Sequence, residues 1–124
     1  MEFFVMRYVP NAVLSRHLDV GVVLFEKMAD RVLFAKSRFI ESMEQISAFD
    51  PDADLDVLQS AFRDIGRKLS SPTEREEVLY TLQDTCSNVL QVVGPKPILV
   101  PGDPIAELDR LSSLHFPTFR QRGR

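Results

Sequence analysis

The chain has 124 residues, enough for one domain with a substantial hydrophobic core. Its 44% hydrophobic and 27% charged residues are ordinary for a globular protein, and its formal net charge is −3. A net acidic chain without a broad basic stripe argues against strong non-specific binding to nucleic acid.

The first third of the chain predicts three antiparallel strands joined by turns. Three apolar runs rich in β-branched and aromatic residues lie at about 3–9, 18–25 and 32–36. In the first run both faces are mostly apolar, which predicts a strand that is covered on both sides. Gly21, inside the second run, predicts a bulge or a close backbone approach. Simple alternation would place Asp19 on the same face as Gly21 and Val23.

Near residue 39 the apolar residues change to helical spacing. A short helix is predicted over about 40–48. The clearest helix follows, with one apolar stripe and an N-cap from Asp52 or Asp54. The stripe consists of Leu55, Leu58, Phe62, Ile65 and Leu69. Thr73 and Glu76 fit a capping box that would begin a third helix over about 74–85.

The last third predicts two more strands and a closing helix. The strands are expected at 87–93 and 98–100, with a turn at 94–97 between them. Asp103 followed by Pro104 is a strong start signal for a helix that ends near Leu114, because an acid caps the first turn and proline suits its first position.

The resulting order of elements is β-β-β-α-α-α-β-β-α. It predicts an α+β fold, a single domain over residues 1–116 with a mainly antiparallel sheet covered by helices. Residues 117–124 contain three arginines and no acid, and we expect them to form a flexible basic tail. One cysteine, Cys86, excludes an internal disulfide and favours a cytoplasmic setting. The longest apolar run, 20–25, is too short to span a membrane, so no membrane partner is expected.

No motif of known chemistry emerges from the residues. The acidic run 50–56 is spaced like a calcium loop, but it has Leu55 where the loop needs Gly and Ala61 where it needs Glu. His17 and His115 have no further ligand at metal-binding spacing. The five glycines form no phosphate-binding loop. We therefore predict no catalytic residue, no metal and no cofactor, and the sequence favours a protein that is not an enzyme.

Arg7 and Asp19 are the polar residues that interrupt the first two apolar runs, and the two strands should pair. One interpretation is an ion pair that fixes the strand register. The other is a polar pocket on the sheet with Tyr8 and Arg16 at its rim, where a rigidly held arginine would suit a carboxylate or phosphate group. Arg7, Tyr8, Arg16 and Asp19 are thus the candidate binding residues.

Three stretches in chain order resemble a family of small bacterial proteins known as domain of unknown function 3037. The first stretch is similar to the family's R-x-V-P strand and its E-x-x-N-x-G-V-V-L-F strand, the second leads into the long helix, and the third is similar to the closing D-P-x-x-E-L-x-R-L helix. They lie at residues 7–10 with 19–25, at 49–56, and at 103–111. Arg16 and Asp19 stand where the family tends to carry Glu and Asn.

The resemblance implies a compact bacterial cytoplasmic domain without an established activity, cofactor or substrate. Members of the family that it resembles are often encoded beside a HipA-like kinase. The resemblance therefore implies an accessory or regulatory partnership with such an enzyme. The departures at Arg16 and Asp19 would alter any site that the family builds from its Glu and Asn.

Three hypotheses about function follow. The first is a non-catalytic interaction or regulatory module that binds another protein or itself, because an acidic segment at 39–56 and a basic end after 109 would steer a partner. The second is a small enzyme or ligand-binding protein with a polar pocket around Arg7 and Asp19. The third is a nucleic-acid-binding accessory protein, whose basic tail would need further basic side chains such as Lys36 and Arg38 on the same face.

Overall fold

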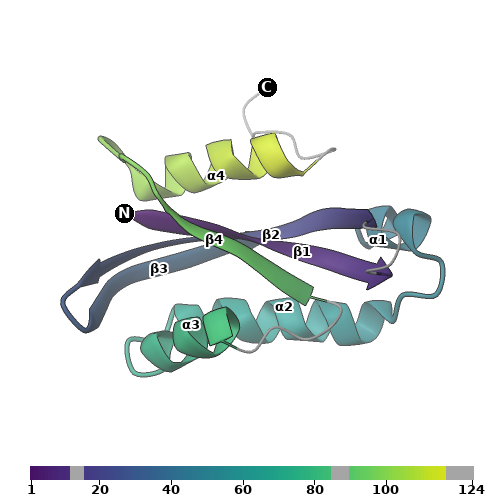
Figure 1. Cartoon of the computed structure of the whole chain (residues 1–124), viewed down its shortest axis with the longest axis horizontal. Helices are drawn as coiled ribbons and strands as arrows, with labels where there is room; N and C mark the ends of the chain where they lie inside the picture. Colours follow the sequence, from purple (N-terminus) through teal and green to yellow (C-terminus); the bar gives the residue numbers. More distant parts are fainter. Residues whose placement is uncertain (12–15, 85–89, 117–124) are drawn as a thin grey trace.

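The computed structural model describes residues 1–11, 16–84 and 90–116. Its centre is a four-stranded antiparallel sheet with helices on both faces, which makes the chain a single α+β domain (Figure 1). The strands are β1 (Glu2–Asn11), β2 (Arg16–Met28), β3 (Arg31–Phe39) and β4 (Leu90–Pro97), in the spatial order β3-β2-β1-β4. The predicted meander of the first three strands is therefore confirmed, and β4 adds to its β1 edge.

Two helical layers cover the sheet. The first layer contains α2 (Leu55–Leu69) and α3 (Arg75–Asp84), and the second is α4 (Pro104–His115) on the opposite face (Figure 1). The short helix α1 (Met43–Phe49) lies at the end of the sheet, and its Ile46 is buried in the same core as α2. Each layer closes its own core, one around α2 and α3 and the other around α4. The central strands β1 and β2 consequently bury both of their faces, which explains their nearly continuous apolar runs.

The helix starts follow from local capping. Asp54 caps α2 by accepting a hydrogen bond from the backbone N–H of Val57 at 3.2 Å. Asp103 caps α4 in the same way, accepting from the N–H of Ile105 at 3.0 Å, and Pro104 takes the first helical position. Both predicted starts are confirmed.

The sequence between residues 90 and 100 folds differently from the prediction. One strand, β4, runs through the stretch 94–97 that was expected to be a turn, and residues 98–100 are not a strand. Pro97 and Lys96 pair with Glu2 and Phe3 of β1. Proline is tolerated there because β4 is an edge strand, where a missing N–H can face solvent. The first part of the predicted strand 87–93 lies outside the described residues.

The predicted capping box of α3 is wrong. The helix begins at Arg75, so Glu76 is too early in the helix to reach back to a cap at Thr73. Its Oε1 instead accepts a hydrogen bond from the backbone N–H of Val32 on β3, at 3.1 Å. A long-range contact to the edge of the sheet therefore replaces the expected local one.

A β-bulge in β2 decides which face Asp19 occupies. Met6 pairs with Gly21 and Arg7 pairs with Asp19, so Val20 is an extra residue between the two pairs. Val20 packs in the core beneath α2 together with Val23. Asp19 is thereby turned to the α4 face, which corrects the expectation from simple alternation. A Cβ at Gly21 would lie 2.7 Å from the Phe39 ring, so the predicted close approach is confirmed as well.

No helix in the described ranges is long and apolar enough to cross a membrane. The predicted basic tail at 117–124 and the single cysteine, Cys86, lie outside the described residues.

Candidate functional site

Three polar side chains from three elements meet on the α4 face of the sheet. Nε of Arg7, from β1, donates to Oδ1 of Asp19, from β2, at 3.0 Å. Nδ1 of His115, in the last turn of α4, lies 3.1 Å from the other carboxylate oxygen, Oδ2. We call these residues the Arg7–Asp19–His115 cluster. The predicted pairing of Arg7 with Asp19 is present, and a histidine is added to it.

Tyr8 and Arg16 do not belong to this cluster. The Tyr8 side chain points to the opposite face of the sheet, where its hydroxyl donates to Oδ2 of Asp50 at 2.6 Å. The guanidinium of Arg16 lies over the Phe49 ring, 4.9 Å from its centroid, and Phe49 meets the Tyr8 ring edge-on. The structure thus divides the four candidate residues into two pairs on two faces.

The environment of Tyr8 disfavours ionisation of its hydroxyl. Burial raises the pKa of Tyr8 to about 12, and the hydrogen bond to Asp50 and the negative charges of Asp50 and Asp52 act in the same direction. A phenol held neutral in this way anchors the loop after α1 to β1. It is a structural contact rather than the rim of a polar pocket.

His115 could not have been placed in the cluster from the sequence. It lies 96 residues from Asp19, and no spacing rule links residues that far apart. The only local signal is a basic side chain in the last turn of a helix, which the helix dipole favours anyway. The contact follows from the way α4 crosses the sheet.

The basic side chains that a nucleic-acid surface would need on β3 are engaged with other groups. Nε of Arg38 donates to Oδ1 of Asp109 on α4 at 3.0 Å, and Nζ of Lys36 donates to the Ser70 hydroxyl at 3.3 Å. The arginine tail that the same hypothesis requires lies outside the described residues.

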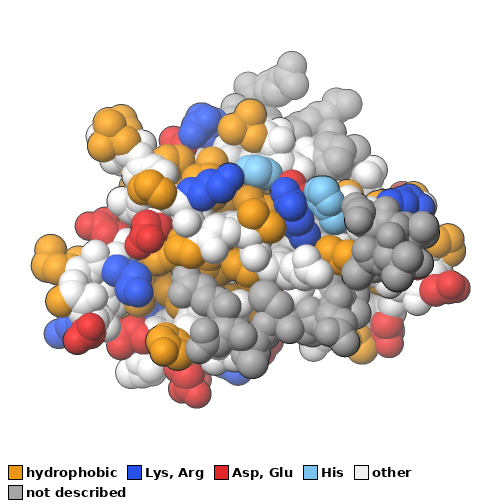
Figure 2. Space-filling view, viewed as in Figure 1, with side chains coloured by type: hydrophobic (Ala, Val, Ile, Leu, Met, Phe, Trp, Pro, Cys, Tyr) orange, Lys and Arg blue, Asp and Glu red, His pale blue; other side chains and the backbone are white. Residues whose placement is uncertain are grey.

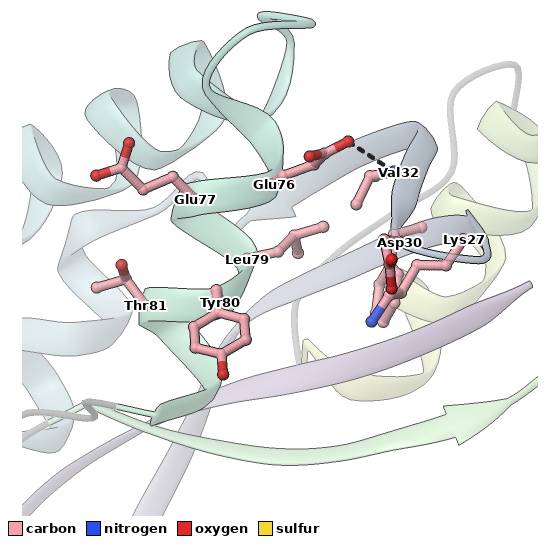
Figure 3. Close-up of a pocket in the computed structure, with 9 residues that line it drawn as sticks. Lys27, Asp30, Val32, Glu76, Glu77, Leu79, Tyr80 and Thr81 are labelled. Atoms are coloured by element: carbon pink, nitrogen blue, oxygen red, sulfur yellow. Dashed lines mark hydrogen bonds between the residues drawn. The ribbon is translucent and has the colours of Figure 1, made fainter.

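A second candidate site lies on the other face of the molecule, between the β2–β3 hairpin and α3. It is an open hollow of about 430 Å³. Its lining, which we call the hairpin–α3 groove, consists of Phe25, Lys27, Asp30, Val32, Glu76, Glu77, Leu79, Tyr80 and Thr81. Leu79 points from α3 toward the hairpin, and Lys27 and Asp30 form the opposite wall (Figure 3).

The groove combines an apolar floor with an acidic rim. Phe25 and Leu79 are buried at its base, whereas the Tyr80 side chain is 72% exposed beside it. The lining includes three carboxylates, from Asp30 and the two glutamates of α3, and one ammonium group, that of Lys27 on the same wall as Asp30. Such a groove suits an apolar side chain with positive charge next to it.

Neither site has the arrangement of a metal centre. Among residues 1–11, 16–84 and 90–116, no three His, Cys, Asp or Glu side chains converge closely enough to hold a metal ion. The cluster presents hydrogen-bonding and charged groups, and the groove presents an apolar base with charged side chains around it.

The fold is a small α+β domain with one candidate site on either side of its sheet. The chain belongs to the family described as "Protein of unknown function (DUF3037)", whose family model matches residues 3–115. This confirms the resemblance inferred from the sequence motifs. No curated protein and no solved structure matches the chain.

Proposed function

We propose that this protein is a non-catalytic interaction module that binds another protein through the hairpin–α3 groove. The partner segment it suits has an apolar or aromatic side chain flanked by lysine or arginine. The observation that carries the proposal is the groove itself, an apolar base open to solvent with three carboxylates against one ammonium on its rim.

The apolar base supplies the contact area. Tyrosine is among the residues that contribute most to protein interfaces, because it offers a large rigid surface with a hydroxyl at its tip. Tyr80 lies next to this base on α3, and Met28 at the end of the neighbouring hairpin strand is also largely exposed. Exposed apolar residues gathered around a hollow are typical of a binding surface.

The acidic rim supplies the selectivity. Its carboxylates would attract a basic segment and repel an acidic one, and like charges brought together at an interface are costly. Glu76 is already held by the backbone of Val32, whereas the carboxylate of Glu77 points away from the hairpin (Figure 3). The rim carboxylate on the hairpin side of the groove is that of Asp30. The single cysteine of the chain supports a cytoplasmic setting for this role.

The test uses synthetic peptides and backbone amide NMR spectra. One peptide has a central phenylalanine flanked by lysines, and its matched control has glutamates in place of the lysines. We expect the basic peptide alone to shift the amide signals of 27–32 and 76–81. Tyr80→Ala should weaken its binding about tenfold or more, because removal of an interface tyrosine commonly costs about 2 kcal/mol. Val57→Ala, which removes an exposed apolar side chain on α2, is the matched control.

Two outcomes would contradict the proposal. Equal binding of the basic and the acidic peptide would show that the rim does not select charge. A dimer of the protein that dissociates in Tyr80→Ala, seen by sedimentation, would show that the groove serves a second copy of this chain instead of another protein.

A further inference from the structure

The Arg7–Asp19–His115 cluster lies on the α4 face of the sheet, away from the groove proposed for the partner. Figure 2 shows both histidine side chains of the chain close to several Lys and Arg side chains on one face of the molecule. Asp19 is the least exposed member, with 16% of its side chain accessible, against 33% for Arg7 and 28% for His115. The two nitrogen-bearing side chains therefore flank an inner carboxylate and remain open to solvent.

The hydrogen bonds leave specific donors unused. An ionised carboxylate only accepts, so Nε of Arg7 and Nδ1 of His115 both donate to Asp19. Arginine has four further N–H groups on its two Nη atoms, and histidine has its second ring nitrogen, Nε2. Of the residues that the structure describes, none is hydrogen-bonded to these atoms.

The neighbouring charges on this face are matched in pairs. On α4, Arg110 pairs with Glu107, and Asp109 pairs with Arg38 of β3. The Arg38–Asp109 pair has the same Nε to Oδ1 distance of 3.0 Å as Arg7 and Asp19, and both of its side chains are 39% exposed. It lacks a third member, and it is an ordinary surface ion pair. The cluster differs from it by the histidine and by the deeper carboxylate.

We propose that the cluster binds an oxyanion, a carboxylate or phosphate group presented by a ligand. The oxyanion would accept hydrogen bonds from the Nη groups of Arg7 and, whenever the ring carries both protons, from Nε2 of His115. Arginine and imidazolium donors form short, strong bonds to such groups. Asp19 is the positioning residue, because its two oxygens orient both donors and it is turned to this face by the bulge at Val20.

The end of α4 holds the backbone of His115 in place. His115 is in the last turn of the helix. The next residue, Phe116, is buried and its N–H donates to the carbonyl of Ser112 at 2.8 Å, which holds the end of the helix in place. A donor with a fixed backbone loses less entropy on binding.

The test titrates the full chain with inorganic phosphate and, separately, with acetate, in slightly acidic buffer at constant ionic strength set with chloride. The side-chain nitrogen signals of Arg7 and His115 are followed by NMR. We expect saturable shifts of both with at least one of the two anions, and the comparison identifies the class that the site prefers. Arg7→Gln should weaken the affinity about tenfold or more, whereas Arg38→Gln should leave it unchanged.

Two further variants separate binding from folding. His115→Gln removes the ring from a partly exposed helix end and should also weaken the affinity, even if Arg7→Gln proves unstable. In Asp19→Asn the preference of the ring for a proton on Nδ1 should be lost, which its nitrogen shifts report directly. Shifts that stay linear with anion concentration, or that persist unchanged in Arg7→Gln and His115→Gln, would overturn the proposal.

Discussion

Tyr8 illustrates how a single side chain can join two distant parts of the fold. Its ring is buried beneath the α2 layer, and its hydroxyl reaches out to the carboxylate of Asp50, 42 residues away. Burial and the neighbouring carboxylate both favour the neutral phenol, because an ionised one would be desolvated and placed beside a like charge. Because of this contact, the free energy of unfolding should vary with pH in the alkaline range.

We expect the free energy of unfolding to fall as pH rises between 10 and 12. The pKa of Tyr8 is raised from 10.0 in the unfolded chain to about 12 in the folded one, so its contribution is complete below pH 10 and is lost as pH passes through the folded value. Measured by denaturant unfolding, the free energy of unfolding should fall by about 2 kcal/mol between pH 10 and 12. In Tyr8→Phe this fall should be absent.

Tyr80→Phe is the control for this experiment, because Tyr80 is the only other tyrosine and is largely exposed. That variant should keep the alkaline loss of stability. If Tyr8→Phe and the unmodified protein lose stability in parallel, the phenol is not the group responsible.

At the scale of single elements, both edges of the sheet are protected against pairing with another strand. Along β3, Nη1 of Arg75 donates to the carbonyl of Leu33 at 3.2 Å, and Glu76 accepts from the N–H of Val32. At the other edge, Pro95 and Pro97 interrupt the row of N–H donors of β4. Self-association by strand addition is therefore disfavoured at both edges, and the face of α3 remains as a contact surface.

Glu76→Ala should open the edge of β3 locally. Without the carboxylate, the amide of Val32 loses its acceptor, so its hydrogen exchange should become faster by about tenfold, with a loss of about 1 kcal/mol in global stability. Amide exchange followed by NMR gives both quantities.

Glu77→Ala is the matched variant, since it removes the neighbouring exposed carboxylate of the same helix. It should leave the exchange of the Val32 amide unchanged. Equal acceleration in both variants would mean that the effect comes from the loss of helix charge and not from the hydrogen bond.

At the scale of the whole molecule, one sheet carries two cores. Leu69 is fully buried in the core beneath α2, and Leu108 is fully buried in the core beneath α4. The strands β1 and β2 contribute side chains to both cores through alternate residues. Because the same strands support both layers, loss of either core should disrupt the other.

We expect Leu69→Ala and Leu108→Ala each to lower the free energy of unfolding by about 2–5 kcal/mol, through the lost apolar contact and the cavity left behind. Unfolding followed by circular dichroism and by calorimetry should remain one cooperative transition in both variants. Leu99→Ala, at a position that is 88% exposed, should have little effect. A separate early transition in Leu108→Ala would show that α4 is a weakly coupled layer.

The features that the sequence predicts well are those that depend on near neighbours in the chain. Asp54 and Asp103 cap their helices through residues two or three positions away, and the stripe of α2 buries Leu58, Phe62 and Leu69 as its spacing requires. The three amino-terminal strands follow from alternation and turn residues in the same way.

The features that the sequence misses depend on contacts between distant segments. The sequence predicts a turn at Pro95 and Pro97. In the structure both residues belong to β4, because this segment pairs with the free edge of β1. His115 joins the cluster only because α4 crosses the sheet above Asp19. Tyr8 and Arg16 were expected beside Arg7, but strand pleating and a separate aromatic contact place them on the other face.

The amino-acid sequence by itself determined the fold class, the starts of α2 and α4 and the presence of an Arg7–Asp19 pair. The tertiary structure alone decided which face that pair occupies and which third residue joins it. The physical reason is the register of β2, because one extra residue at Val20 rotates Asp19 toward α4, and a shift of one residue in a strand exchanges its two faces.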